Sequence, residues 1–282
     1  MKQFLPAVLL VSFFTSCTTA NFIQHTPSLV QSGTHTEKGE FTGRALYSTG
    51  SSSSNTVENS TGASPYQQVR GFQAQGSYAV DDHFAVQGSF MHSGEKGGST
   101  ENGVKSIVYD YNRNVAEAGL AFYQALGDKS NFYFELGGGA GLGSYKAKEL
   151  SSLLVPGGRY YDHSVFKLYV QPSFYFISPN VHVQTGFKFA SVNFNNIKSN
   201  YTSLEKQSRD LTLEPKLNTT VIDFFFRTDI YLPGLPWLGF SGQTQVSSEL
   251  QKKFNTNIND NNYGIGVCFR FGELTEQKAK KN

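Results

Sequence analysis

The sequence predicts one all-β domain, an antiparallel transmembrane β-barrel of about ten strands over residues 40–271. Three observations lead to this prediction. Strand-like segments alternate apolar with polar side chains, which gives a sheet one face for lipid and one for a lumen. The connections alternate between short and long, as in outer-membrane barrels with short periplasmic turns and long extracellular loops. Aromatic residues reach 14% of the chain and glycines number 28, whereas charged residues make up only 16%, a balance that suits strands in contact with lipid.

The connections set the expected topology. Asp, Gly, Pro and Asn favour tight turns, and they gather at short links near residues 81–83, 127–130, 178–180 and 233–236. Long links are expected near residues 49–66, 94–104, 149–162, 198–211 and 250–261. Because the number of strands is even, both chain termini should lie on the periplasmic side.

Residues 1–16 are typical of a lipoprotein signal peptide. A lysine precedes an apolar core that is too short to span a bilayer as a helix. Small residues then precede Cys17, as in a bacterial lipobox, so Cys17 is the predicted lipidation site; an ordinary signal peptide with an incidental cysteine is the alternative. Residues 17–39 are polar and lack a period, which predicts a tether between the lipid and the first strand.

The alternation also assigns charged side chains to the lumen. A Lys or Arg that faced lipid near the midplane would cost about 2–4 kcal/mol, so the inward direction is favoured. A barrel of this size is narrow, since wide channels need sixteen or more strands. We therefore expect either a network of paired charges that plugs the lumen or a selectivity ring, formed by Glu117, Glu135, Lys167, Lys188, Asp223, Arg227, Asp229 and Arg270.

Several strands are longer than a membrane requires. Residues 105–125, 131–148 and 211–231 exceed the 9–11 residues that cross the hydrocarbon layer, so the barrel should project beyond the outer leaflet. The last strand, Tyr263–Phe271, ends in an aromatic residue that resembles the signal recognised by the outer-membrane assembly machinery. Residues 272–282 are polar and rich in lysine, which predicts a periplasmic tail.

Two irregular features fall inside predicted strands. Pro172 removes a donor from the strand ladder, which predicts a bulge at that position. The glycine-rich run 137–143 lacks the spacing of a dinucleotide-binding loop, and no helix follows it. We expect these glycines to make room for bulky lumen side chains such as Tyr169 and Tyr175.

Two elements near the N-terminus carry a family resemblance. Glu37-Lys38-Gly39-Glu40 opens the first strand, and residues 73–86 follow the hairpin pattern QAxYAVTDHFAV, with departures at Asp81 and at Gly76-Ser77. Together with the lipobox, they make the stretch from Cys17 to Phe90 resemble small outer-membrane lipoproteins of Bacteroidota. The resemblance covers about the first third of the chain. It implies a lipid-anchored barrel in the outer membrane and carries no assigned activity.

Few residues suggest chemistry. Asp81-Asp82-His83 could serve acid–base or metal chemistry, but Asp also suits a turn, which is the favoured interpretation. Asp162, His163 and Asp210 lie near the outer rim, where omptin-like barrels place the Asp–His and Asp pairs that activate water. A base must lie within hydrogen-bonding reach of the group it deprotonates, and a sequence alone does not show this.

These observations favour a non-enzymatic outer-membrane barrel lipoprotein with a structural or surface-interaction role. A narrow small-solute pore and an omptin-like surface hydrolase are the alternatives, and a soluble lipocalin-like carrier is a weaker one. Expected partners are outer-membrane lipid, the assembly machinery and an unidentified protein. A net charge of only +2, without a basic patch, argues against nucleic acid. No catalytic residue, cofactor or metal ligand is predicted.

Overall fold

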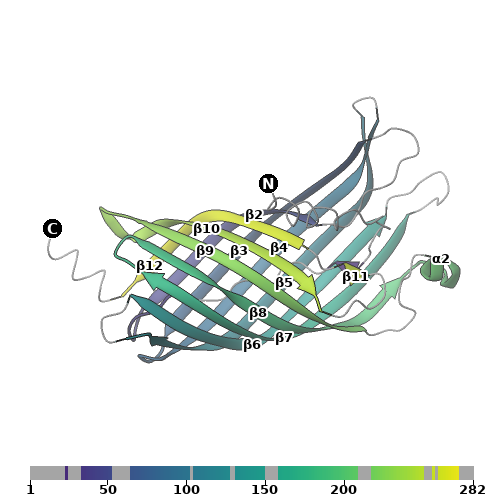
Figure 1. Cartoon of the computed structure of the whole chain (residues 1–282). Coiled ribbons are helices and arrows are strands. Elements are labelled where there is room, and N and C mark those ends of the chain that lie inside the picture. The colour runs from purple at the N-terminus through teal and green to yellow at the C-terminus, as the bar shows by residue number, and fades with distance from the viewer. Residues whose placement is uncertain are drawn as a thin grey trace, which may run out of the picture.

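The computed structural model describes residues 23–24, 33–52, 64–101, 104–127, 131–149, 158–208, 217–250, 256–257 and 260–272. Ten strands close into one antiparallel barrel (Figure 1), so the predicted all-β fold class and strand number are confirmed. The strands are β2 (Phe41–Ser52), β3 (Ser64–Ala79), β4 (Phe84–Glu101), β5 (Val104–Ala125), β6 (Phe132–Glu149), β7 (Arg159–Ile177), β8 (Val181–Ser199), β9 (Leu217–Leu232), β10 (Leu235–Glu249) and β12 (Asp260–Phe271).

The first and last barrel strands close the ring. β12 pairs with β2 from Asp260↔Ser52 to Phe271↔Phe41. Outside the barrel, β1 (Ile23–Gln24) pairs in parallel with β11 (Thr256–Asn257), and α2 (Ser203–Ser208) follows β8. No helix among the described residues is long and apolar enough to cross a membrane. We call the end of the barrel with the short turns the inner end and the opposite end the outer end.

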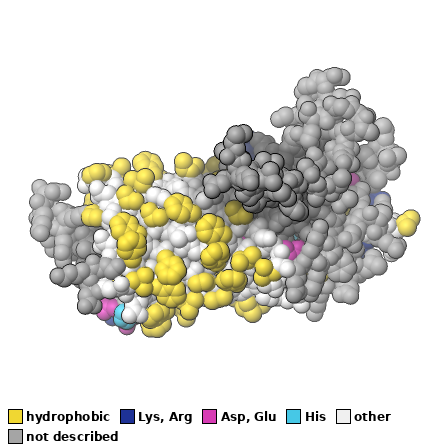
Figure 2. All heavy atoms as spheres, in the orientation of Figure 1, with side chains coloured by type: hydrophobic (Ala, Val, Ile, Leu, Met, Phe, Trp, Pro, Cys, Tyr) yellow, Lys and Arg dark blue, Asp and Glu magenta, His cyan; other side chains and the backbone are white. Residues whose placement is uncertain are grey.

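The outward face of the barrel carries an apolar band. On β6 the outward residues are apolar or glycine from Phe132 to Leu142, and they are polar from Ser144 onward. Ten residue steps of about 3.3 Å, tilted by about 40°, give this band a height of about 25 Å, the usual height of the lipid-facing band of outer-membrane barrels. Figure 2 shows the apolar side chains over the visible face, from the inner end at the left to the middle of the barrel.

The polarity of the barrel wall reverses at the outer edge of this band. Within the band, β7 buries Lys167 and exposes Leu168; beyond the band, the same strand buries Val165 and Tyr161 and turns Ser164 outward. Side chains of a strand always alternate between its two faces. A reversed pattern therefore means that the outer surroundings change from lipid to water. The switch is marked by two successive apolar residues on each of four strands: Val115-Ala116, Val165-Phe166, Phe189-Ala190 and Val221-Ile222.

The connections follow the prediction with one correction. Short links follow β3, β5, β7 and β9, and longer ones follow β2, β6, β8 and β10, as expected. The long link expected over residues 94–104 is wrong, because β4 and β5 stay paired up to Glu101↔Val104 with one irregularity at Gly97/Gly98. A hairpin in water can be polar on both faces, so its polar, glycine-rich composition does not distinguish it from a loop.

The bulge expected at Pro172 is also absent. The pairs Val170↔Phe189 and Ser173↔Gly186 keep the same register on both sides of it, and the irregularity between β7 and β8 lies at Asp162/Ser164 instead. Gly186 explains the regular course, because a Cβ at this position would lie 2.5 Å from the carbonyl oxygen of Pro172. The glycine lets β8 pass close to the proline.

Residues 33–40 fold into the inner end of the barrel. The sequence assigned residues 17–39 to a tether, but Thr34 and His35 are fully buried, as is Glu40, the first residue of the predicted barrel. The backbone of this segment also joins the wall, since the Gly39 amide donates to the Ala79 carbonyl at 2.9 Å. Polar composition indicated a solvated linker, yet a polar segment is equally suited to a polar lumen. The part of the tether before residue 33, apart from β1, lies outside the described residues, as does the predicted tail beyond Gly272.

Candidate functional site

The interior of the barrel holds the charged side chains that the sequence singled out. All eight predicted lumen charges are at least nine-tenths buried. Four further buried charges escaped the sequence analysis: Glu40, Arg44, Glu95 and Arg113. Arg44 and Arg113 lie at inward positions of β2 and β5, so strand parity alone could have identified them. Glu95 was missed because it fell in the segment expected to be a loop.

The first charge cluster lies at the outer edge of the band. Glu117 of β5 lies between two lysines, with Lys188 Nζ at 2.5 Å and Lys167 Nζ at 3.5 Å from its carboxylate oxygens. Lys188 Nζ also lies 3.8 Å from the centre of the Tyr169 ring, which adds a cation–π contact. Asp223 accepts a hydrogen bond from Ser247 nearby along the wall.

The glycine run makes the space for this cluster. A Cβ on Gly139 would lie 2.5 Å from the Tyr169 hydroxyl oxygen, and a Cβ on Gly141 would lie 2.7 Å from Cγ of Glu117. The prediction for Tyr169 is therefore confirmed. Tyr175 lies elsewhere, stacked on Tyr133 with ring centres 5.1 Å apart.

A second cluster lies deeper within the band. Asp229 of β9 accepts a hydrogen bond from Arg44 Nη2 at 2.6 Å and another from the Ser241 hydroxyl at 2.6 Å. Arg227 Nε lies 3.6 Å from the same carboxylate. Buried charges are tolerated when they are paired and hydrogen-bonded, and Asp229 with Arg44 meets both conditions.

The docked segment 33–40 forms a third cluster at the inner end. Arg270 Nη2 donates to Glu40 at 2.6 Å, Thr34 Oγ1 lies 3.3 Å from His182 Nδ1, and His35 Nε2 lies 2.7 Å from Ser77 Oγ. His35 precedes the first barrel strand. Burial, followed by the positive charges of Arg44, Arg270 and Arg227, lowers its pKa to about 3.

Ser77, His35 and Glu40 lie in the order of a nucleophile, a base and an acid. The arrangement does not suit catalysis, because His35 Nδ1 is 3.9 Å from the Glu40 carboxylate, beyond a hydrogen bond. The Ser77 side chain is also only 4% exposed, and its hydroxyl lies 3.2 Å from the Val86 carbonyl oxygen, to which it donates. These contacts explain how the segment docks rather than how a substrate could react.

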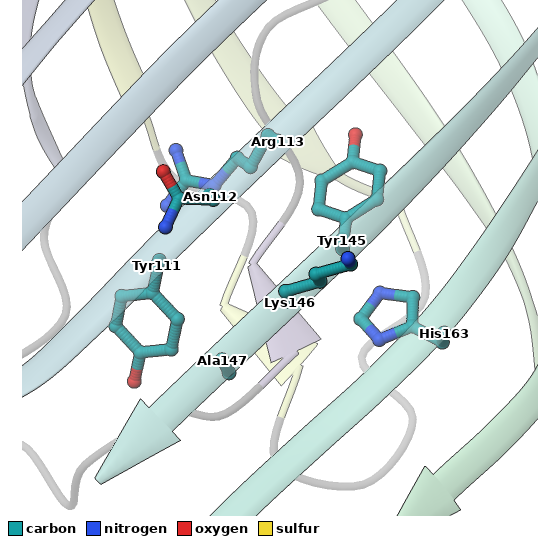
Figure 3. A pocket seen from close by; sticks show the side chains of 7 residues that line it. All are labelled: Tyr111, Asn112, Arg113, Tyr145, Lys146, Ala147 and His163. Atoms are coloured by element: carbon teal, nitrogen blue, oxygen red, sulfur yellow. The ribbon is translucent and has the colours of Figure 1, made fainter. Parts of the chain in front are cut away.

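Beyond the band, the interior is aromatic and aliphatic. His163 stacks on Tyr145 with ring centres 5.1 Å apart and meets Phe194 edge-on at 5.2 Å. Figure 3 shows Tyr145 and His163 beside each other on β6 and β7, with Arg113 on the neighbouring strand β5. A cavity of about 10 Å³ beside them has room for about one water molecule. Neither ring nitrogen of His163 has a hydrogen-bond partner among the described residues.

Asp162 and His163, which the omptin-like alternative would use, do not face one another. His163 points inward and Asp162 outward, since adjacent residues of a strand face opposite sides. Asp210 and Cys17 lie outside the described residues. Asp81-Asp82-His83 forms the predicted turn, with Val80 N donating to Phe84 O at 2.9 Å. Within the described part of the chain, no group of three or more His, Cys, Asp or Glu residues is placed to hold a metal ion.

The buried charges balance. Among the described residues, six acids and six bases are buried inside the barrel, so their formal charges cancel. The acids are Glu40, Glu95, Glu117, Glu135, Asp223 and Asp229, and the bases are Arg44, Arg113, Lys167, Lys188, Arg227 and Arg270. A selectivity ring needs an excess of one sign. The described buried charges show no such excess.

Comparison with known proteins agrees with the barrel fold. No protein-family model and no curated protein matches the chain. It is similar in structure to the translocator domain of autotransporter NalP from Neisseria meningitidis, with a TM-score of 0.52 and 8% identity over 84% of this chain and 90% of that one. The fold is that of an outer-membrane β-barrel. At this identity, the similarity extends to the fold alone.

Two further structures show weaker similarity. The outer membrane protein OprG from Pseudomonas aeruginosa has a TM-score of 0.40 and 11% identity, over 85% of this chain and 99% of that chain. The outer membrane protease OmpT from Escherichia coli has a TM-score of 0.44 and 9% identity, over 86% and 99% of the two chains. The resemblance to Bacteroidota lipoproteins stays a prediction.

Proposed function

We propose that this chain is a closed, non-enzymatic barrel of the outer membrane that presents a folded platform at the cell surface for contact with another protein. The observation that carries this proposal is the reversal of wall polarity at the outer edge of the band. Beyond that edge the barrel has an apolar interior and a polar exterior, like a water-soluble domain. This part of the barrel is therefore built to keep its shape outside the bilayer.

Specific contacts stiffen the platform. Arg113 of β5 donates to Glu95 of β4 at 2.5 Å, and the Tyr201 hydroxyl donates to Glu149 at 2.7 Å, which joins the segment after β8 to β6. Phe194 is completely buried among the aromatic side chains. A surface that is ordered before binding loses less conformational entropy when a partner docks.

Photo-crosslinking in living cells tests the platform. A crosslinking amino acid at Lys146, outward and beyond the band, should capture a protein, whereas the same group at Leu142, four residues along on the same face of β6 but inside the band, should contact lipid. Lys96 on the outer part of β4 gives a second outward position. Crosslinks to protein that are no more frequent at Lys146 and Lys96 than at Leu142 would contradict the proposal.

The alternative function is a narrow pore, and a conductance measurement distinguishes it from the proposed closed barrel. The equal numbers of buried acids and bases support a closed barrel, so purified protein in planar bilayers should give no discrete current steps. Steps that change with Lys167→Glu or Arg227→Glu would replace the proposed function by that of a pore.

The proposal includes an anchor and an assembly signal. Cys17 would carry the lipid, and β12 with its terminal Phe271 would engage the assembly machinery, which leaves residues 273–282 in the periplasm. Palmitate labelling of the wild type should disappear in Cys17→Ala. Equal labelling of both proteins would remove the anchor from the proposal.

A further inference from the structure

We infer that the partner of the platform is a protein with an acidic surface, and that it binds to one side of the barrel, where four exposed lysines point outward beyond the apolar band. We call them the basic patch: Lys96 of β4, Lys146 and Lys148 of β6, and Lys198 of β8. The inference rests on the proposed function. It adds the side of the platform that makes the contact and the charge of the partner.

Strand register joins the basic patch into one area. Asp110 of β5 is the register partner of Lys96 on one side and of Lys148 on the other. Asp162 of β7 lies in the same way between the other two lysines of the patch. Side chains of register partners on one face have Cβ atoms about 4.5–5.5 Å apart. The four lysines and two aspartates therefore form a continuous surface over five neighbouring strands.

This surface has an excess of positive charge. Two aspartates can balance only two of the four lysines, so a formal charge of two remains for a partner. Interfaces between proteins bring together potentials of opposite sign, which speeds encounter and excludes partners of the wrong charge. The excess therefore indicates an acidic partner.

The opposite side of the barrel is neutral. In the ring of ten strands, β12 lies opposite β6. The outward side chains that the structure describes on the outer parts of β9, β10, β12 and β2 are uncharged, and their polar members are Asn218, Thr220, Ser248, Asn261 and Thr49. Solubility alone does not require the charges to gather on one side. The bias fits a directed contact.

The height of the basic patch favours a protein over lipid headgroups. Lys146 and Lys148 lie four and six residues beyond Leu142, the last apolar outward residue of β6. With the rise and tilt used for the band, these steps correspond to about 10 and 15 Å. The headgroup layer of one leaflet is only about 5–8 Å thick. The backbone that carries both lysines thus lies above this layer.

An apolar area borders the basic patch. Tyr160 of β7 is 40% exposed and is the register partner of Lys148, and Leu204 of α2 is 76% exposed. The Tyr160 amide donates to Asn200 Oδ1 at 2.7 Å, which holds the segment before α2 against β7, and Figure 1 shows α2 at the outer end of the barrel. Apolar side chains beside charged ones match the composition of protein interfaces, which have an apolar centre and a polar rim.

Photo-crosslinking from a neutral position locates the contact. Asn112 of β5 is exposed and is the register partner of Lys146, so a crosslinking amino acid at position 112 leaves the basic patch intact. In living cells it should capture a protein, and the crosslinked peptide should contain more Asp and Glu than Lys and Arg. Asn261 of β12, on the neutral side, is the matched control and should capture clearly less.

Removal of the charges then tests the chemistry. In the chain that carries Lys146→Gln, Lys148→Gln and Lys198→Gln, the yield at position 112 should fall about tenfold, because each exposed ion pair contributes a factor of up to about five. Arginine at the same three positions should preserve the yield. Lys38→Gln, an exposed lysine at the inner end, should leave it unchanged. Heat-modifiable migration of each variant verifies that the barrel is intact.

The outcomes separate this inference from the proposed function. A full yield of protein crosslinks in the glutamine variant, or a crosslinked peptide without an acidic excess, would overturn the inference and leave the platform in place. Lipid adducts at position 112 instead of protein would overturn it in favour of headgroup binding. The proposed function itself fails when Lys146 and Lys96 capture protein no more often than Leu142 does.

Discussion

The barrel has two interiors that depend on different forces. Within the apolar band, the lumen is held by paired charges such as Glu117 with Lys188 and Asp229 with Arg44. Beyond the band, it is held by packed rings and aliphatic groups such as Phe194 and Val165. The backbone ladder runs through both parts without a break. The difference shows that the surroundings of the wall, lipid or water, decide what fills the inside.

The two interiors should respond differently to the loss of a side chain. A buried ion pair adds little net stability, but the loss of one partner leaves a charge without compensation. An apolar core instead loses stability in proportion to the atoms removed and the cavity that remains. Substitutions in the two parts should therefore fail in different ways.

Glu117→Gln should have the largest effect. It removes the acid that two buried lysines share, which should lower the free energy of unfolding by about 3–5 kcal/mol. Denaturant unfolding in detergent micelles, followed by the loss of heat-modifiable migration, measures it. Glu117→Asp keeps the charge and should lose clearly less stability than Glu117→Gln. Equal losses for both variants would mean that side-chain volume, not charge, stabilises this cluster.

Phe194→Ala should have the next largest effect, confined to the part beyond the band. The cavity should cost about 3 kcal/mol, and hydrogen exchange should accelerate at the outer ends of β8 and β9. Phe189→Ala on the same strand is the matched control, because Phe189 faces outward within the band and its loss should leave this exchange unchanged. Faster exchange throughout the barrel in Phe194→Ala would show that the two interiors unfold together.

The sequence predicted much of the wall and little of what lies inside it. The strand number and the inward charges follow from the two-residue period that contact with lipid imposes, and the short turns follow from their Asp, Gly, Pro and Asn residues. The reversal at Val165-Phe166 and Phe189-Ala190 is also visible in the sequence, as a pair of apolar residues that shifts the period by one. The two-residue period with apolar residues outward holds only inside the band, so a polar hairpin beyond it, such as 94–104, has the same pattern as a loop.

The contents of the lumen could not be predicted in this way. His35 and Glu40 belong to a polar stretch without a period, and only the closed barrel brings Ser77 and Arg270 to them. The same limit applies to β1, whose partner lies more than two hundred residues away in the sequence. Such contacts depend on tertiary structure and leave no local pattern.

Acidification should weaken the docking of residues 33–40. The pKa of His35 is about 3 in the folded chain and about 6.5 when exposed, so the undocked form binds the proton more readily. The docked segment therefore keeps its full stability above pH 6.5. The free energy that favours the docked form falls as the pH drops towards 3, and at pH 5 it is about 2 kcal/mol lower than at neutral pH. A spin label at Lys38→Cys should gain mobility over this range. His35→Gln does not titrate and should show no such change; a transition that persists in this variant would assign it to another group.

His163→Phe should have the smallest effect and the opposite sign. Both ring nitrogens of His163 are buried without a partner among the described residues, whereas the ring itself is well packed against Tyr145 and Phe194. Phe keeps the packing and removes the two buried ring nitrogens, so the free energy of unfolding should rise by about 1 kcal/mol. His163→Ala, which removes the ring, should instead destabilise the part beyond the band. If His163→Phe is less stable than the wild type, the ring nitrogens must hold a partner, and the cavity beside them has room for one water molecule.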